Sequence, residues 1–236
     1  MWQGTRQTSE ARAGQNGGLL ALLLLALTAG AAAEPAGPGP ATTVGQGADR
    51  LVEVSALAAG LRVELRYATL NNFTQHIIYT PSARCYLRAP VAARLATVHR
   101  LLQAQGLGLK VYDCYRPRSA QQTLWDIVPD ERYVANPKAG SRHNRGAAVD
   151  LTLVDKDGRE LLMPTPYDDF TVKAHRTYRG GPAEALRNRE ILERAMVAQG
   201  FVAMPTEWWH FDDPDSKRYP LTDISFDALL FGRSPK

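Results

Sequence analysis

The chain has 236 residues, and 44% of them are hydrophobic, a share that is ordinary for a globular protein. Its formal net charge is only +4, and no run of lysine or arginine is long enough to follow a phosphate backbone. We therefore expect no nucleic-acid partner, and the length allows one domain or a tight pair of domains.

The first 33 residues are typical of a secretory signal peptide. Two arginines precede an apolar run at residues 18–29, and Ala31-Ala32-Ala33 forms a small-residue cleavage site. The alternative is a permanent membrane anchor, but this run is much shorter than the roughly 20 residues that a spanning helix needs. We expect residues 1–33 to be removed and the mature protein to be exported, to a bacterial periplasm or cell envelope, without a stable membrane anchor.

A tether is expected to follow the signal peptide. Residues 34–47 are rich in proline, glycine, alanine and threonine and cannot bury enough apolar surface to order themselves. The rest of the chain shows no internal repeat and no second linker. We therefore predict one domain, residues 48–236.

The first part of this domain predicts a strand, a helix and a second strand. Residues 61–67 alternate apolar and polar side chains, the period of a half-buried strand. Apolar residues then recur at helical spacing over residues 91–102, and Gly106 stands where a C-terminal cap would. Residues 107–114 form the next predicted strand.

The middle of the domain predicts a helix, a loop and a hairpin. Pro117 suits the first turn of a helix that runs to about residue 128, and residues 129–142 are loop. Residues 147–154 alternate again, and a hairpin-type turn leads to a return strand at residues 160–163.

The last part predicts a polar loop, a helix and two short strands. The loop covers residues 164–181, the helix residues 182–200, and the strands residues 201–204 and 207–211. Helices mixed with mostly antiparallel strands indicate an α+β domain with a sheet flanked by helices, rather than a doubly wound parallel sheet.

The only two cysteines, Cys85 and Cys114, both lie in the part expected to be exported. In an oxidising compartment such a pair is expected to form a disulfide, which would stabilise the fold by about 3–4 kcal/mol on the loop-entropy model. Two buried free thiols are the alternative. Neither cysteine has the close spacing of a zinc site, so we leave both out of the metal ligands.

Three residues are candidate metal ligands. His143 and Asp150 are separated by Gly146, which lets the chain turn before the strand that carries Asp150. His210 is the third candidate, because its strand can pair beside the Asp150 strand and its aromatic neighbours would exclude water. Two imidazoles and a carboxylate are ordinary zinc ligands, and three protein ligands leave the fourth position of a catalytic site for water.

Glu207 is the candidate general base. Glu207 lies three residues before His210. On a helix this spacing would put both side chains on one face, but on a strand it would put them on opposite faces. We therefore expect Glu207 to reach the site from an irregular position before the strand begins. Taken singly, an aspartate on a strand is more often a cap and a histidine among aromatics a core residue, but their joint occurrence favours a site. We interpret His76, His99 and His175 as structural or surface residues.

These motifs strongly resemble the VanX-type D-alanyl-D-alanine dipeptidases, members of the zinc D,D-peptidases that share a fold with the Hedgehog signalling domain. The likeness covers about residues 60–212. The matching motifs are Ser141-x-His143-x-x-Gly146-x-Ala148-x-Asp150, Glu207-Trp-Trp-His210, Tyr67-Ala-Thr-x-Asn-Asn-Phe73-Thr, Asp113-x-Tyr115-Arg116-Pro117 and Asp168.

The resemblance implies roles for the matching positions. It implies one Zn²⁺ per chain held by His143, Asp150 and His210, with Glu207 as general acid and base. The position of Arg116 implies stabilisation of the developing oxyanion, and a surface arginine before proline is the alternative. Three further positions imply contacts with the termini of a dipeptide, although capping or turn roles remain open for them: these are Tyr67, Ser141 and Asp168.

The expected function is zinc-dependent hydrolysis of the D-Ala-D-Ala dipeptide to D-alanine in the cell envelope. A D,D-carboxypeptidase or endopeptidase acting on peptidoglycan stem peptides is one alternative. A non-catalytic module that binds wall fragments is another, although such a module has no need for Glu207. The signal peptide and the cysteine pair depart from the cytoplasmic vancomycin-resistance enzymes, so dipeptide scavenging or wall turnover is the expected use.

Overall fold

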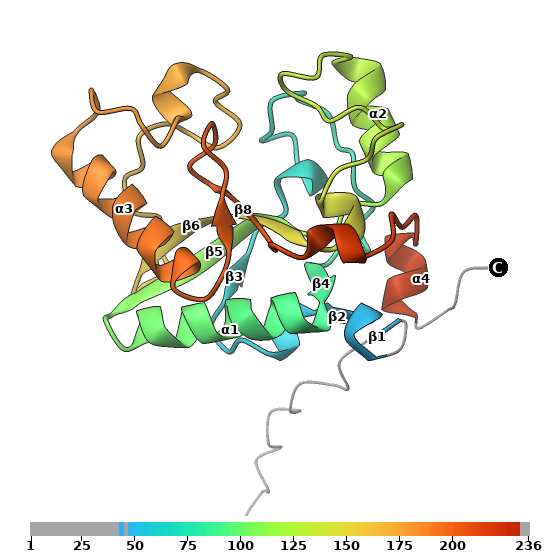
Figure 1. The fold of residues 1–236 in the computed structure, drawn as a ribbon, viewed down its shortest axis with the longest axis horizontal. Helices are drawn as coiled ribbons and strands as arrows, with labels where there is room; N and C mark the ends of the chain where they lie inside the picture. The colour runs from blue at the N-terminus through green and yellow to red at the C-terminus, as the bar shows by residue number, and fades with distance from the viewer. Residues whose placement is uncertain (1–42, 45–46, 232–236) are drawn as a thin grey trace, which may run out of the picture. The chain divides into compact units, whose positions relative to one another are not determined.

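Two β-sheets and four α-helices build the part of the chain that the computed structural model describes, residues 43–44 and 47–231 (Figure 1). The larger sheet has the order β3-β5-β6-β8-β7 and comprises β3 (Arg62–Val63), β5 (Leu107–Asp113), β6 (Ala148–Asp155), β8 (His210–Asp212) and β7 (Val202–Ala203). The smaller sheet has the order β1-β2-β4 and comprises β1 (Thr43–Val44), β2 (Leu51–Glu53) and β4 (Tyr86–Arg88). Of these strand pairs, β3–β5 is parallel and the others are antiparallel, which confirms the predicted α+β class.

The helices are α1 (Ala89–Gln103), α2 (Arg118–Ile127), α3 (Ala183–Val197) and α4 (Phe226–Leu230). Prolines stand at the starts of the first three, where a missing N–H costs no helical hydrogen bond. The apolar stripe of α1 is fully buried, and Gly106 follows with φ +75°. The three long helices predicted from periodicity are thus confirmed, whereas α4 was not predicted.

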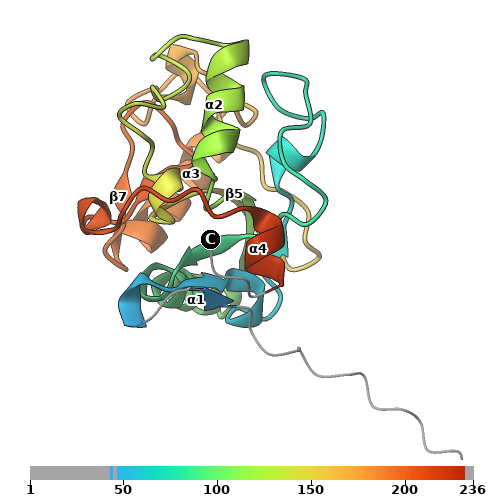
Figure 2. The same ribbon diagram turned by 90° about the vertical axis from the view of Figure 1, so that its right-hand side faces the viewer.

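The helices divide between the two faces of the larger sheet. α1 and α3 pack on each other, α1 contacts β5 and α3 contacts β6. In both views α1 lies below the sheet, whereas α2 lies above it together with the loops around residues 70–80 and 129–142 (Figures 1 and 2). The side of the sheet away from α1 is therefore enclosed by loops, which can carry functional side chains.

Several predicted strands are wrong in extent. The strand predicted at residues 61–67 is reduced to β3, because the chain turns into a 3₁₀ helix, η3 (Arg66–Ala68), which buries Tyr67. The return strand predicted at residues 160–163 is a single bridge between Val154 and Glu160. The strand predicted at residues 207–211 begins only at His210.

The N-terminal predictions fall partly outside the described residues. Thr43 and Val44 form β1 on the edge of the smaller sheet, so the tether predicted for residues 34–47 does not extend through them. The signal peptide predicted for residues 1–33 lies outside the described residues. Within the described ranges, no helix combines the length and apolarity needed to span a membrane.

The predicted disulfide is confirmed. Cys85 and Cys114 are bonded, and both are buried. The bridge joins the residue before β4 to the residue after β5, and the N–H of Tyr115 donates to the carbonyl of Tyr86 beside it. The end of β5 is therefore fixed to the smaller sheet at the point where Arg116 follows.

Candidate metal centre

The three predicted metal ligands come from a turn and two paired strands. His143 begins a 3₁₀ helix, η4 (His143–Arg145), which ends at Gly146 in the left-handed conformation with φ +66°. The chain then enters β6, and Asp150 pairs directly with His210 of β8 in the antiparallel register. Because paired residues of neighbouring strands point to the same face, this register brings the carboxylate and the imidazole together.

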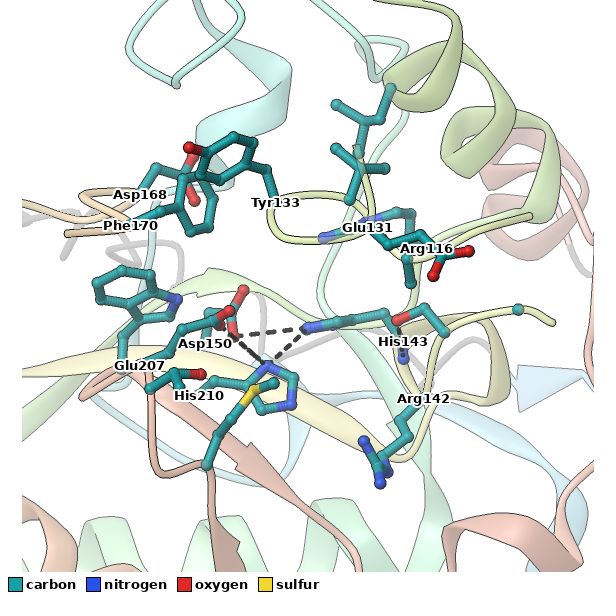
Figure 3. Close-up of a pocket in the computed structure, with 18 of the residues that line it drawn as sticks. Arg116, Glu131, Tyr133, Arg142, His143, Asp150, Asp168, Phe170, Glu207 and His210 are labelled. Atoms are coloured by element: carbon teal, nitrogen blue, oxygen red, sulfur yellow. Dashed lines mark hydrogen bonds and ion pairs between the residues drawn. The ribbon is translucent and has the colours of Figure 1, made fainter. Parts of the chain in front are cut away.

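The ligand atoms converge on one point (Figure 3). His210 Nδ1 lies 2.9 Å from Asp150 Oδ1 and 3.2 Å from His143 Nε2, and His143 Nε2 lies 3.5 Å from Asp150 Oδ1. All three side chains are buried, and the three atoms lie within 4.8 Å of one another. His143, Asp150 and His210 therefore form a His-Asp-His metal site.

The outer partners of the two imidazoles determine which nitrogens face the centre. The backbone carbonyl of Cys114 can only accept, so the N–H at His143 Nδ1 donates to it at 2.7 Å, and Nε2 keeps its lone pair for a metal. His210 Nε2 similarly donates to Asp212 Oδ1 at 2.8 Å, which leaves Nδ1 for the centre. Both tautomers fit a metal such as Zn²⁺.

The third ligand, Asp150, is held by a hydrogen bond from a neighbouring loop. The Tyr167 hydroxyl donates to Asp150 Oδ2 at 3.0 Å, so Oδ1 remains available for a metal.

Burial alone would lower the pKa of His210, but the hydrogen bonds with Asp150 and Asp212 raise it well above its ordinary value. The centre therefore favours a positive charge, which a divalent cation supplies in place of protons.

Glu207 borders the centre without joining the cluster. It lies in the turn before β8, and its Oε2 is 4.0 Å from His210 Nδ1. Glu207 therefore lies in an irregular position before the strand, as expected, and its approach to a metal-bound water stays a prediction. Burial raises the pKa of Glu207, and the neighbouring charge of Asp150 raises it further, although the two histidines oppose this.

Arg116 is held rigidly beside the centre. Its Nε and Nη2 donate to Asp113 Oδ2 at 3.1 and 2.6 Å, its Nη1 donates to Gln121 at 2.8 Å, and its guanidinium lies 4.9 Å from the centre of the Tyr67 ring. Burial alone would lower the pKa of Arg116, but Asp113 and nearby tyrosines raise it well above the ordinary value. The side chain therefore stays cationic, and because it is buried it is not the surface arginine that was the alternative.

One pocket of about 530 Å³ is lined by all the predicted site residues except the two disulfide cysteines. Its walls include Tyr67, Arg116, Ser141, His143, Asp150, Asp168, Glu207 and His210. In Figure 3, Asp168 and Phe170 lie on one side of the metal ligands and Arg142 on the other. The pocket therefore extends in two directions from the metal site.

The Asp168 end of the pocket holds a buried carboxylate with weak partners. Tyr67 Oη donates to Asp168 Oδ1 and the N–H of Phe73 donates to Oδ2, both at 3.4 Å. Burial raises the pKa of Asp168 well above its ordinary value, and the charge of Asp150 adds to this. Asp168 also has φ +61°, an unusual backbone conformation for a residue other than glycine. A cationic ligand at this end would satisfy the carboxylate.

Ser141 has a role in the turn. Its hydroxyl accepts from the N–H of His143 at 3.2 Å, and its own N–H donates to Asn144 Oδ1 at 2.7 Å. The capping alternative for Ser141 is therefore real, although the residue also lines the pocket. His99 is buried on α1 and bonds to backbone groups of Ala59 and Leu109, which confirms a structural role.

Two residues that support the metal ligands were not predicted. Asp212 follows His210 by two positions on β8, and this strand spacing puts both on one face, so the period of the strand could have indicated it. Tyr167 precedes Asp168 in a loop, and no local pattern indicates that its hydroxyl reaches Asp150.

The chain is similar in sequence to known peptidases. A family model described as D-Ala-D-Ala dipeptidase, peptidase M15, matches residues 47–228. A D-alanyl-D-alanine dipeptidase of Escherichia coli is 39% identical over 180 residues, which cover 76% of this chain and 93% of that protein. One of Enterococcus faecalis is 34% identical over 193 residues, covering 71% and 92%.

Solved structures show weaker similarity. A vancomycin-resistance D,D-pentapeptidase in complex with Zn(II) aligns with a TM-score of 0.38 at 16% identity, covering 64% of this chain and 88% of that one. An LD-carboxypeptidase that recognises peptidoglycan aligns with a TM-score of 0.37 at 18% identity, covering 63% and 70%.

Proposed function

The chain belongs to the D-Ala-D-Ala dipeptidase family of M15 peptidases, and from this we propose that it hydrolyses D-Ala-D-Ala to two molecules of D-alanine with one zinc ion per chain. The observation that carries the proposal is the convergence of His143 Nε2, Asp150 Oδ1 and His210 Nδ1 on the wall of a pocket that Glu207 also lines. When bound there, zinc supplies a Lewis acid that polarises the scissile carbonyl and lowers the pKa of a water molecule.

Glu207 is the proton carrier in this proposal. Its carboxylate takes a proton from the attacking water and returns it to the nitrogen of the leaving D-alanine. Its position supports this role, because Oε2 lies 4.0 Å from a ligand atom of His210 without being part of the ligand cluster. The raised pKa of Glu207 makes it a better base than an exposed glutamate.

Arg116 stabilises the negative charge that develops on the carbonyl oxygen. Asp113 and Gln121 fix its guanidinium, so little reorganisation is needed when the charge appears. Asp113 balances part of the charge of Arg116. Nη1 and Nη2 each use one N–H in a bond to the protein, so each has a second N–H that can donate to the substrate.

The Asp168 end of the pocket recognises the ammonium group of the dipeptide. Asp168 and the Tyr67 hydroxyl are the polar groups proposed for this contact, and Ser141 is proposed to contact the carboxylate at the other end. A free ammonium is what distinguishes a dipeptide from the acylated end of a stem peptide, so these contacts favour dipeptidase over carboxypeptidase activity.

We also propose that the protein acts in the cell envelope after removal of residues 1–33. The support is the sequence pattern of the signal peptide together with the disulfide, a bond typical of oxidising compartments. Dipeptide released from peptidoglycan is then the expected substrate pool.

A substrate comparison tests the function. Purified zinc-loaded protein is incubated with D-Ala-D-Ala or with an acylated pentapeptide ending in D-Ala-D-Ala, and the products are measured by mass spectrometry. We expect cleavage of the dipeptide, and turnover of the pentapeptide alone would replace this proposal with a D,D-carboxypeptidase.

A matched pair of variants tests the base. Glu207→Gln is expected to lower kcat by about 10²–10⁴-fold, the usual contribution of a general base. Glu131→Gln is the control, because Glu131 lines the same pocket but is bonded to Asn136. Full activity of Glu207→Gln would show that another group moves the proton, and inactivity of the zinc-loaded wild type on both substrates would favour a binding module.

A further inference from the structure

The pocket carries five cationic side chains, and most of them are already held by acceptors of the protein. The five are Arg116, Arg132, Arg142, Arg145 and Lys217. Arg116 and Arg132 form short ion pairs with aspartates, and Arg145 donates to a backbone carbonyl. Within the described part of the chain, the one ion pair of Arg142 is a long contact of 3.4 Å with Asp212.

Lys217 differs from the other four. It lies in the 3₁₀ helix η6 (Ser216–Arg218), and no hydrogen bond or ion pair joins its ammonium to any residue of the described ranges. It is exposed, yet it lines the same pocket as the metal ligands, next to the buried Ser216. A cation in this position is available to a ligand.

The backbone of η6 is fixed relative to the metal ligands. The N–H of Asp213 donates to the carbonyl of Ala147 at 2.8 Å, and the Asp213 carboxylate pairs with Arg94 at 2.7 Å. Arg145 of η4 donates to the carbonyl of Tyr219, directly after η6. The turn that carries His143 and the turn that carries Lys217 are thus joined, which fixes the backbone from which the Lys217 side chain extends.

Two side chains of opposite charge, Asp168 and Arg142, lie on opposite sides of the metal ligands (Figure 3). The side chain of Arg142 contacts Asp212, four residues before η6. A dipeptide zwitterion has an ammonium at one end and a carboxylate at the other. The segment after η6 is bonded to η4, next to Arg142, so a dipeptide with its ammonium at Asp168 would extend its carboxylate toward η6.

We propose that Lys217 is a binding residue for the C-terminal carboxylate of the dipeptide, on the side of the metal site away from Asp168. The proposal rests on the dipeptidase function proposed above and assigns the carboxylate end of its substrate a charged partner. Lys217 would make the enzyme select a free carboxylate over a neutral C-terminus.

The test compares three variants on two ligands. Lys217→Gln removes the charge, Lys217→Arg keeps it, and Arg218→Gln is the matched control, since Arg218 is the adjacent exposed cation but does not line the pocket. The ligands are D-Ala-D-Ala as substrate and D-alanyl-D-alaninamide, which lacks the carboxylate charge, as its competitor.

We expect Lys217→Gln to raise the KM for D-Ala-D-Ala by about tenfold with kcat little changed, as expected for the loss of one hydrogen bond to a charged group. The inhibition constant of the amide should stay the same, and Lys217→Arg and Arg218→Gln should behave like the wild type. The KM of the wild type should also rise with added salt more steeply than that of Lys217→Gln.

Equal effects on dipeptide and amide, or a KM unchanged within twofold, would overturn the assignment of Lys217. Failure of the proposed function would give a different result: the wild type would cleave no dipeptide, and the assignment of Lys217 would then also be wrong.

Discussion

At the scale of single residues, the site depends on the hydrogen bonds behind the metal ligands. The acceptors Cys114 and Asp212 select the tautomers of His143 and His210, and Tyr167 occupies the second oxygen of Asp150. Each ligand atom is therefore aimed at the centre before a cation arrives, which reduces the ordering that binding requires.

Asp212→Ala tests this support. Without the acceptor, the His210 imidazole is free to change tautomer and orientation, and we expect zinc affinity to fall by about 10–100-fold. Competition with a chelating dye measures this without reference to activity. Asp215→Ala is the control, because Asp215 is an exposed aspartate on the same segment. Equal zinc affinity in the two variants would contradict the role of Asp212.

We expect the carboxylate of Asp168 to lower the stability of the folded protein while it serves to bind the substrate ammonium. Its folded-state pKa is raised, chiefly by burial, so its ionisation destabilises the folded protein above the ordinary pKa of aspartate and has no effect below it. Asparagine tolerates the positive φ of this position.

We therefore expect Asp168→Asn to raise the Tm at pH 8 by a few degrees, the shift that about 1 kcal/mol produces in a domain of this size, and to leave it unchanged near pH 3. The same variant should lose kcat/KM for D-Ala-D-Ala by about 10–100-fold, because the ammonium loses its charged partner. Thermal melts at the two pH values and a dipeptide assay check both parts. A lower Tm at pH 8 would show that the carboxylate stabilises the fold.

At the scale of elements, Gly146 connects the turn of His143 to the strand of Asp150. Its φ is +66°, and an added Cβ would lie 2.5 Å from the buried Leu51 Cδ2. Gly106 has a similar φ of +75° but open space around the added atom.

Replacement of the two glycines by alanine separates backbone strain from crowding. Gly106→Ala should lower the free energy of unfolding by about 1–2 kcal/mol through strain alone. Gly146→Ala should lower it by roughly 2–5 kcal/mol, because crowding adds to strain. Denaturant titration of both variants measures the difference, and equal losses would mean that Leu51 moves aside without cost.

The sequence predicts elements best where a periodic pattern is long. α1, β5 and β6 have seven or more residues each and were predicted within one or two residues. β1, β3 and β7 have two residues each, too few to show a period, and β2 and β4 of the smaller sheet have only three residues each. Residues 61–67 alternate as a strand does, but tertiary packing of Tyr67 prevails over that pattern.

The site was more predictable than the short strands. The ligand set and Glu207 stand in two compact motifs, and an antiparallel register joins them. Asp212 was missed although the period of β8 could have indicated it, because it lies two residues after His210 on the same strand. Tyr167 and Lys217 were not predicted, because no local pattern indicates that Tyr167 reaches Asp150 or that Lys217 lines the pocket.

At the scale of the whole molecule, the disulfide connects the smaller sheet to the metal centre. Cys114 supplies the carbonyl that orients His143, and its neighbour Asp113 holds Arg116. The bond therefore affects both the stability of the fold and the position of site residues.

Simultaneous replacement of Cys85 and Cys114 by serine is expected to lower the free energy of unfolding by about 3–4 kcal/mol, from the loop-entropy model. Zinc affinity should fall as well, since the carbonyl of Cys114 is held less firmly. Denaturant titration and chelator competition measure the two effects. A loss of stability with unchanged zinc affinity would show that backbone hydrogen bonds alone orient His143.

We propose that one zinc ion, held by His143, Asp150 and His210, makes this chain a dipeptidase. The most direct measurement is metal analysis of the purified protein paired with D-Ala-D-Ala turnover, before chelation, after chelation and after zinc is returned. We predict one zinc per chain, loss of turnover on removal and recovery on return, with neither zinc nor turnover in His210→Ala. Undiminished turnover by protein that is free of metal would contradict the account.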